Sequence, residues 1–265
     1  MKKLMTALAV CLAAGFVAAG SVTSSNVVGY VNVSVSSANV AGYSMLGLAF
    51  DKVGSPDGQL LNELLPNASN FVGGYDDADS DTISVWNGIG YDIYFFSASD
   101  FGAANQNNVW LDINTTQQPT KRFLSGTGFW FRRHSGSATI TLAGQVPTGS
   151  FSLSCPASNV GGFSQVAYPF STTLNLNDAS LNWLAAGATG GYDDTDSDTI
   201  SVWNGIGYDI YFFSASDFGA PNQNNKWLDI NTTQQPVTPI ALGKGMWYRK
   251  HGGTLTMTLP QPYTL

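Results

Sequence analysis

Two short acidic runs carry the side chains best suited to hold a metal ion. Carboxylates alternate in segments 76–81 and 193–198, as at the start of a calcium loop, where hard oxygen atoms converge on one cation. The EF-hand pattern fails, because Thr82 and Gly88 stand where that loop needs its glycine and its bidentate glutamate. The candidate ligands are Asp77, Asp79, Asp81, Asp194, Asp196 and Asp198. Each run is either a loop that bound calcium would stabilise or a solvated acidic turn before a strand.

A second pattern alternates aromatic and basic side chains along two predicted strands. Its members are Trp130, Arg132 and His134, then Trp247, Arg249 and His251. A period of two places each trio on one face of its strand, and Trp and Arg are frequent in binding hot spots. No partner for acid–base catalysis accompanies either histidine. The trios predict a recognition row; the alternative places Trp in a core or between repeats, with Arg and His ending the strand.

Aromatic and amide side chains are concentrated between residues 86 and 110 and again between 203 and 227. The candidate ligand-binding residues there are Trp86, Tyr91 and Tyr94, then Trp203, Tyr208 and Tyr211. Flat aromatic faces beside amide groups are typical of sugar-binding surfaces. The same residue types are also ordinary in strands and loops. Carbohydrate binding is therefore one of two functional hypotheses.

Catalysis is not predicted. Asp92 with Asp100, or Asp112 with an acidic loop residue, has the chemistry of a glycosidase pair, but both copies are retained almost unaltered, whereas an enzyme needs only one working centre. Cys155 aligns with Val35 in an alternating strand, so it is expected to be a buried small side chain rather than a nucleophile.

The elements that must position these residues are duplicated. Residues 74–119 recur as residues 191–236, and only three pairs differ: Ala78/Thr195, Ala104/Pro221 and Val109/Lys226. Residues 21–145 are predicted to form one β-rich repeat and residues 146–265 a second. The junction at 144–149 is short, so the repeats are expected to pack together.

Period-two patterning with many Gly, Asn and Ser turns predicts an all-β fold. We expect two tandem pseudo-equivalent units, each a β-sandwich or a small β-barrel with one short helix. Segments 82–86 and 91–96 flank Asn87-Gly88, a strong hairpin signal. A second hairpin is predicted from 129–133 and 137–142, repeated at 246–250 and 254–259. Leucines near 60–65, and Leu181 to Ala185 in repeat 2, predict the helical turns.

The N-terminus has the pattern of a secretory signal: two lysines, an apolar run and the small residues Ala18-Ala19-Gly20. Residues 1–20 are therefore expected to be removed, leaving no transmembrane segment and placing the protein outside the cell, at its surface or in the periplasm. The net charge of −7 argues against nucleic acid as a partner.

Four motifs resemble those of a group of exported repeat proteins from Planctomycetes–Verrucomicrobia-type bacteria. They are Val27-Val28-Gly29-Tyr30, the segment Asp81-Thr82-Ile83-Ser84-Val85-Trp86-Asn87, the segment Gly126-Thr127-Gly128-Phe129-Trp130-Phe131-Arg132, and Gly144-Gln145-Val146-Pro147-Thr148-Gly149. The resemblance implies an exported β-rich tandem-domain protein, with no activity or catalytic residue to transfer.

These observations predict a secreted, non-catalytic structural or interaction protein of the cell surface or extracellular space, acting through protein contacts or self-association. The alternative is a bivalent carbohydrate-binding protein that uses the duplicated aromatic and amide surface, where two weak sites gain by avidity. No cofactor is expected other than the calcium considered above.

Overall fold

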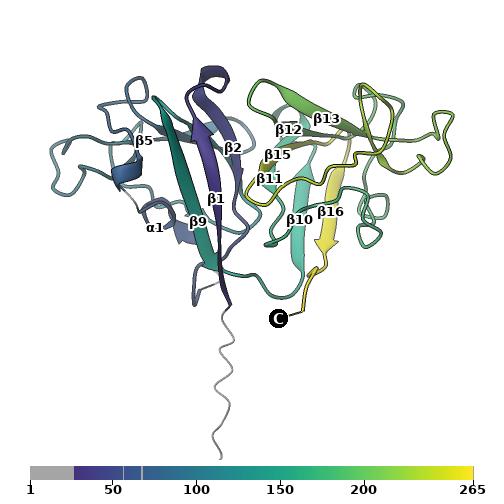
Figure 1. Ribbon diagram of the computed structural model, residues 1–265, viewed down its shortest axis with the longest axis horizontal. Coiled ribbons are helices and arrows are strands. Elements are labelled where there is room, and N and C mark those ends of the chain that lie inside the picture. The colour runs from purple at the N-terminus through teal and green to yellow at the C-terminus, as the bar shows by residue number, and fades with distance from the viewer. Residues whose placement is uncertain (1–26, 56, 67, 265) are drawn as a thin grey trace, which may run out of the picture.

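The computed structural model describes residues 27–55, 57–66 and 68–264. The predicted signal peptide, residues 1–20, lies outside the described residues. The chain forms two β-rich units side by side, the first in purple to teal and the second in teal to yellow (Figure 1). The all-β prediction and the repeated arrangement are confirmed.

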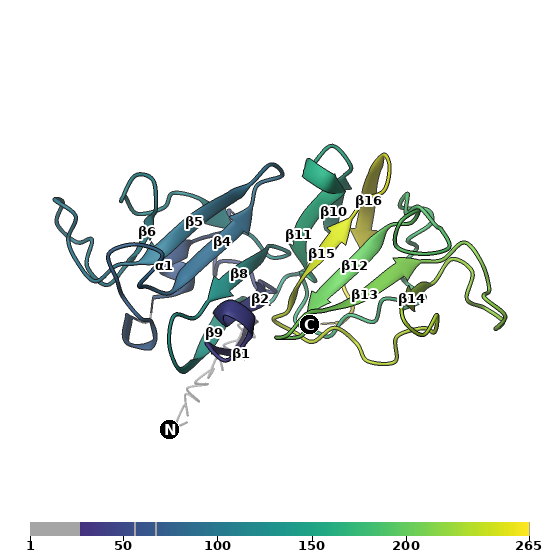
Figure 2. The same cartoon turned by 90° about the horizontal axis from the view of Figure 1, so that it is seen from above.

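Each unit is built around an open, antiparallel, five-stranded sheet. In repeat 1 the order is β2 (Tyr43–Gly47), β8 (Gly128–Arg132), β4 (Thr82–Trp86), β5 (Tyr91–Phe96) and β6 (Trp110–Asp112). In repeat 2 it is β11 (Phe163–Ala167), β15 (Gly245–Arg249), β12 (Thr199–Trp203), β13 (Tyr208–Phe213) and β14 (Trp227–Asp229). The two sheets lie next to each other when seen from above (Figure 2).

A two-stranded sheet covers one face of each larger sheet. β1 (Val28–Ser36) pairs with β9 (Ser137–Gln145), and β10 (Phe151–Pro156) pairs with β16 (Thr254–Leu259). The core of repeat 1 fills the space between its sheets, where Val35 and Ile140 meet Ile83 and Phe131. Alternation along each strand separates this buried face from the opposite face. Each unit is thus a two-layer sandwich of the described strands rather than a closed barrel.

The hairpin predicted around Asn87-Gly88 is confirmed. β4 and β5 pair in register from Thr82 opposite Phe95 to Trp86 opposite Tyr91. The Asn87 side-chain oxygen accepts the backbone N–H groups of Ile89 and Gly90, which closes the turn. β12 and β13 repeat the arrangement around Gly205.

The second predicted hairpin is wrong as a pairing, although its strands exist. β8 pairs with β2 and β4, whereas β9 pairs with β1, and repeat 2 follows the same rule. The chain leaves one sheet at Arg132 and enters the other at Ser137. Alternation gives each strand a buried face but does not specify its partner, so a crossing between sheets and a hairpin have the same local pattern.

The predicted helical turn is present in repeat 1 as α1 (Leu61–Leu64), preceded by β3 (Gln59–Leu60), which pairs with β7 (Arg122–Phe123). Its N-terminus is capped by Glu63, whose carboxylate accepts the Leu60 N–H. The helix predicted at the equivalent place in repeat 2 is wrong: residues 183–187 form turns, and the Asp178 and Asn182 side chains accept backbone N–H groups there, which competes with a helix. Among the described residues, no helix has the length and apolarity required to span a membrane.

Candidate functional site at the junction of the repeats

Each large sheet has one face turned toward the core of its own unit. The side chains of the opposite face meet at the junction between the repeats. In repeat 1 Trp130 lies opposite both Met45 and Ser84, and Trp86 lies opposite Tyr91. These residues point away from the core of their own unit, so the sheet presents an aromatic surface beyond its sandwich. Met45, Trp130 and Trp247 are buried together, with Trp86 and Trp203 packed against them. The two repeats therefore share a third apolar cluster.

Two tryptophans cross this junction reciprocally. The Trp86 indole nitrogen donates to the Phe163 carbonyl at 2.8 Å. The Trp203 indole nitrogen donates to the Tyr43 carbonyl, also at 2.8 Å. The Asn39 amide nitrogen donates to that same Tyr43 carbonyl at 3.0 Å and so helps to hold it in place. Because each repeat supplies one donor and one acceptor, the junction has the form of a two-fold symmetric dimer interface within one chain.

Backbone bonds follow the same two-fold rule. Val40 N–H donates to Gly205 at 2.9 Å, and Val160 N–H donates to Gly88 at 2.8 Å, which binds each hairpin turn to the opposite repeat. Gly47 N–H donates to the Gly243 carbonyl, and its counterpart Ala167 donates to Gly126. Gly88 has a φ of +97°, a conformation that glycine adopts without a steric penalty.

Glycine is also required where the strands of the two repeats touch. A Cβ atom on Gly128 would lie 2.5 Å from the Val166 carbonyl oxygen, well inside van der Waals contact. A Cβ atom on Gly47 would meet the Ala167 Cβ at 2.5 Å. The close approach of β2 and β8 to β11 and β15 therefore depends on the absence of side chains.

A pair of pockets related by the same pseudo-symmetry opens at this junction. One, of about 310 Å³, is lined by Val40, Tyr43, Ser84, Tyr91, Ile93, Trp130, Trp203 and Tyr208. The other, of about 340 Å³, is lined by Trp86, Tyr91, Phe163, Ser201, Tyr208 and Trp247. Tyr91 and Tyr208 belong to both, and they are 43% and 41% exposed. The tyrosine pair thus stands between two aromatic pockets that each use residues of both repeats.

The rings around each pocket meet edge to face. Trp86 and Trp247 have centroids 5.7 Å apart and an interplanar angle of 81°. Tyr91 is nearly perpendicular to both, at 69° and 77°. In the other pocket Trp130, Trp203 and Tyr208 form the equivalent set, at 82°, 68° and 74°. Perpendicular rings stabilise one another through the attraction of a positive edge to a negative face.

Burial raises the pKa of both shared tyrosines. Desolvation is the main cause at Tyr91 and at Tyr208, and it is opposed by hydrogen bonding to the indoles of Trp130 and Trp247 respectively. The proximity of Tyr208 raises the pKa of Tyr91 further. Both phenols are therefore protonated and neutral near pH 7, and the pockets offer hydroxyl groups rather than charge.

Six of the predicted binding residues are brought together at this junction: Trp86, Tyr91, Trp130, Trp203, Tyr208 and Trp247. Tyr94 and Tyr211 are not among them, because the odd–even alternation of β5 and β13 turns them toward the cores of their own units. Sequence reasoning missed Tyr43 and Phe163, which come from β2 and β11, outside the repeated block. Only their position in register with β8 and β15 identifies them.

The basic and imidazole members of the predicted rows serve local structure. Arg132 donates to the Asp77 carbonyl at 2.6 Å, and Arg249 donates to the Asp194 carbonyl at 3.1 Å. His134 and His251 are exposed at the strand ends. The three side chains of each predicted row therefore have separate surroundings. The tryptophan packs at the junction, the arginine binds the acidic loop, and the histidine lies outside the pockets.

The carboxylates of the acidic runs differ in their burial and in their hydrogen-bond partners. Asp79 accepts the Tyr75 and Asp76 N–H groups, and Asp196 does the same for the counterparts in repeat 2. Asp81 is completely buried, pairs with Arg133 and accepts the His134 N–H. Across the described part of the chain, no three His, Cys, Asp or Glu side chains are grouped as a metal site would require. Calcium binding remains a prediction.

The buried carboxylate of repeat 2 has the fuller set of partners. Asp198 pairs with Lys250 at 3.0 Å and accepts the Thr189 and His251 N–H groups and the Tyr248 hydroxyl. Asp198 and Lys250 side chains are 0% and 1% exposed. Sequence reasoning missed Arg133 and Lys250, although each directly precedes a histidine at the end of its strand. These charges fasten the acidic loop to the strand end.

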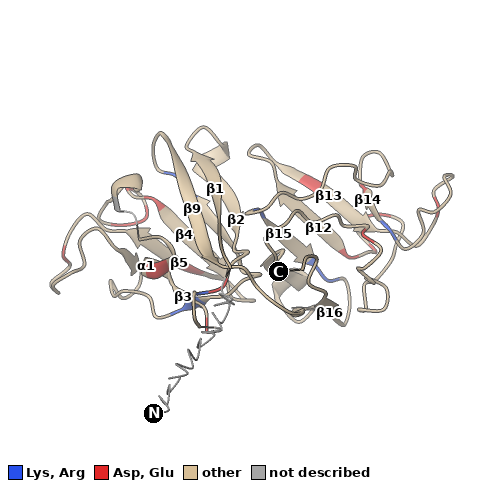
Figure 3. Ribbon diagram, turned by 60° about the horizontal axis from the view of Figure 1, so that its bottom comes forward, with Lys and Arg blue, Asp and Glu red and all other residues tan. Residues whose placement is uncertain are grey.

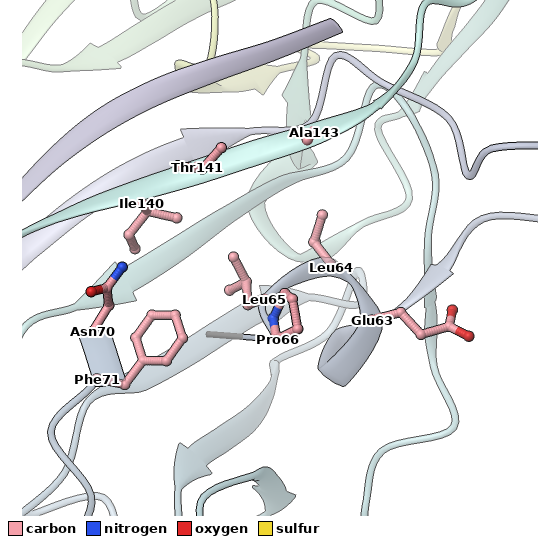
Figure 4. Close-up of a pocket in the computed structure, with 9 residues that line it drawn as sticks. All are labelled: Glu63, Leu64, Leu65, Pro66, Asn70, Phe71, Ile140, Thr141 and Ala143. Carbon is pink, nitrogen blue, oxygen red and sulfur yellow. The ribbon is translucent and has the colours of Figure 1, made fainter. Parts of the chain in front are cut away.

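Two other features lie away from the junction. Cys155 is fully buried, as predicted, and desolvation raises its pKa to about 12. A pocket of about 240 Å³ lies between α1 and β9 in repeat 1, where Leu64, Leu65, Phe71 and Ile140 form its apolar wall (Figure 4). Glu63 at its rim is bound to Lys52.

Comparison with known proteins finds no family model, no curated protein and no solved structure that matches this chain.

Proposed function

We propose that this chain is an exported, non-catalytic structural or interaction protein of the cell surface or extracellular space, in which two duplicated β-units form one pseudo-dimer. The reciprocal tryptophan bonds of the junction carry this proposal. The tryptophans that make these bonds lie in the hairpin 82–96 and in its nearly identical copy in repeat 2. The duplicated segment is therefore the one that joins the two units. The partners would be other proteins or further copies of the chain.

The chemistry of the described residues supports a non-catalytic role. The junction pockets are lined by aromatic, aliphatic and hydroxyl side chains. The buried carboxylates of Asp81 and Asp198 accept backbone N–H groups and pair with the side chains of Arg133 and Lys250 respectively. Such fully partnered carboxylates are typical of a structural role. The raised pKa of Cys155 disfavours its thiolate, which is the nucleophilic form.

Fractionation of the native host, combined with light scattering of the purified protein, tests the proposal. We expect the protein in the surface or matrix fraction, either self-associated or with a protein partner. A variant with both Trp86→Ala and Trp203→Ala should lose this attachment, while Ile89→Ala, at an exposed position of the same hairpin turn, should retain it. Recovery of wild-type protein as a free monomer without a partner, or turnover of a substrate, would contradict the proposal.

Carbohydrate binding is the second candidate, and the exposed tyrosine pair is the observation that favours it. The amide-rich loop 97–109 begins at the opposite end of β5 from Tyr91, and its Gln106 is buried within that loop. Sugar stacking would therefore use Tyr91 and Tyr208 without these amides. A glycan array run with calcium and with a chelator tests this: binding lost in Tyr91→Leu and Tyr208→Leu would favour it, and chelator sensitivity would implicate the acidic loops.

A further inference from the structure

We propose that the two junction pockets are aromatic cages for a quaternary ammonium group, such as the trimethylammonium of choline. The inference goes beyond the structural role proposed above and does not depend on it. In the pocket of about 340 Å³, Trp86, Tyr91 and Trp247 form three mutually perpendicular walls. Phe163 adds a further ring, at 76° to Trp247. Rings set at right angles around one space surround a compact ligand on several sides.

Aromatic walls attract cations, because the face of each ring carries negative charge. Tryptophan is the strongest of these side chains, and the attraction grows when water is removed from the site. Each pocket contains two tryptophans, Trp86 with Trp247 or Trp130 with Trp203. The chain carries a net charge of −7, with few charged residues of either sign across the ribbon (Figure 3). The overall field therefore also favours a cation.

The polar groups of the lining select among cations. The side-chain heteroatoms of the residues that line the larger pocket belong to Ser201, the two shared tyrosines and the two indoles. The Trp86 indole nitrogen is already bonded to the Phe163 carbonyl, and the Trp247 indole is already hydrogen-bonded to Tyr208. A primary ammonium would lose its hydrogen bonds with water and find no carboxylate in the lining, at a cost in free energy. A quaternary ammonium has no N–H group to satisfy, so it meets this lining without that penalty.

The same reasoning separates a quaternary ammonium from a sugar. A pyranose ring carries several hydroxyl groups that need partners when buried. Besides its indoles, the side chains that line the larger pocket offer two tyrosine hydroxyls and one serine hydroxyl. Its rings are perpendicular rather than arranged as a flat platform. Methyl groups around a positive charge match such walls better than a ring of hydroxyls does.

Duplication gives two cages that share Tyr91 and Tyr208. Each cage combines the hairpin of one repeat with strands of the other, so neither is complete within a single repeat. We therefore expect two ligand molecules per chain. Because the tyrosine pair borders both pockets, substitution of either tyrosine should weaken both sites.

Titration of the full mature chain with choline, followed by tryptophan fluorescence and calorimetry, tests the cages. The decisive control is 3,3-dimethylbutan-1-ol, which has the shape of choline without its charge. We expect saturable choline binding at least about 10-fold tighter than binding of this neutral compound, the ratio that a partly desolvated cation–π attraction supplies. Equal binding of the two compounds, or no saturable signal with choline, would overturn the proposal.

Variants then test the rings themselves. Tyr91→Leu and Tyr208→Leu should weaken choline binding by about 10-fold, whereas Tyr91→Phe should retain it, because the aromatic face remains. Tyr75→Leu and Tyr192→Leu are matched controls, since these tyrosines are each 65% exposed and line neither pocket. Loss of binding in Tyr91→Phe would mean that the hydroxyl rather than the ring holds the ligand, which would overturn the cage.

Two further titrations identify the source of the ligand. Phosphatidylcholine vesicles that bind the protein and are displaced by choline would indicate a lipid headgroup; choline binding without vesicle binding would indicate a free small molecule. Either result supports the cages. Methyl glucoside that binds saturably and displaces choline would overturn the assignment in favour of carbohydrate.

Discussion

The indole nitrogen of Trp86 donates a hydrogen bond to the carbonyl oxygen of Phe163, 77 positions later in the chain, at 2.8 Å. The equivalent bond from Trp203 to Tyr43 has the same length. Two identical contacts in opposite directions define an interface that is complementary to itself. The tryptophans of the duplicated hairpins therefore bind the two repeats to each other.

Removal of either indole should destabilise the whole chain. We expect Trp86→Ala and Trp203→Ala each to lower the free energy of unfolding by about 3 kcal/mol, because each truncation leaves a cavity between the repeats and removes one hydrogen bond that crosses the junction. Trp86→Phe keeps most of the apolar area and should cost about 1 kcal/mol. Urea denaturation monitored by circular dichroism measures both losses. Ile89→Ala, 82% exposed, is the control and should be neutral.

A methyl group at the contact between strands should separate the repeats. A Cβ on Gly128 would lie 2.5 Å from the Val166 carbonyl oxygen, so we expect Gly128→Ala to cost about 1–3 kcal/mol by overpacking. Small-angle scattering should show a larger radius of gyration for this variant. A Cβ atom on Gly90 would meet no atom within 4 Å, so Gly90→Ala should change neither the free energy of unfolding nor the radius of gyration. An unchanged Gly128→Ala protein would show that the repeats do not approach this closely.

The buried ion pair of repeat 2 should be sensitive to loss of one partner. Asp198→Asn leaves the Lys250 ammonium buried without its counter-charge, and we expect a loss of about 3–5 kcal/mol. Thermal or urea unfolding measures this loss. Asp194→Asn, in the same loop, is the control and should cost well under 1 kcal/mol, because the Arg249 bond is made to the Asp194 backbone carbonyl rather than to its side chain. Equal effects of the two variants would contradict the structural role of Asp198.

Alkaline pH should destabilise the folded chain. The thiol of Cys155 has a folded pKa of about 12 against an ordinary value of 9.0, and burial also raises the pKa of Tyr248. Above pH 9 the unfolded state therefore releases a proton that the folded state retains, so the free energy of unfolding falls as pH rises toward 12. Urea denaturation at several pH values measures the decline.

Cys155→Val provides the control for this pH dependence. It should fold normally, since valine occupies the equivalent position 35, and its decline should be shallower by up to about 1.4 kcal/mol per pH unit between pH 9 and 12. The native thiol should also resist a disulfide reagent at pH 8 until the protein is denatured. Rapid labelling of the folded protein would contradict the buried position.

Local patterns predicted the elements correctly where contacts are local. The Asn87-Gly88 turn joins neighbours in sequence, so turn chemistry and alternation were sufficient for the hairpin. Cys155 was placed in a core because alternation assigns a face to each strand residue. The same alternation failed for the segment after Arg132, where a sharp turn and a crossing between sheets have similar local sequences.

Composition, periodicity and self-similarity by themselves determined an all-β chain of two equivalent units and drew attention to the repeated aromatic residues. Tertiary structure alone decided that six of those residues meet in one place, with Tyr43 and Phe163 completing the lining. The physical reason is that the sequence records which residues face away from a strand, whereas their neighbours across the junction lie far along the chain. Only the packing of one sheet against another brings them within hydrogen-bonding distance.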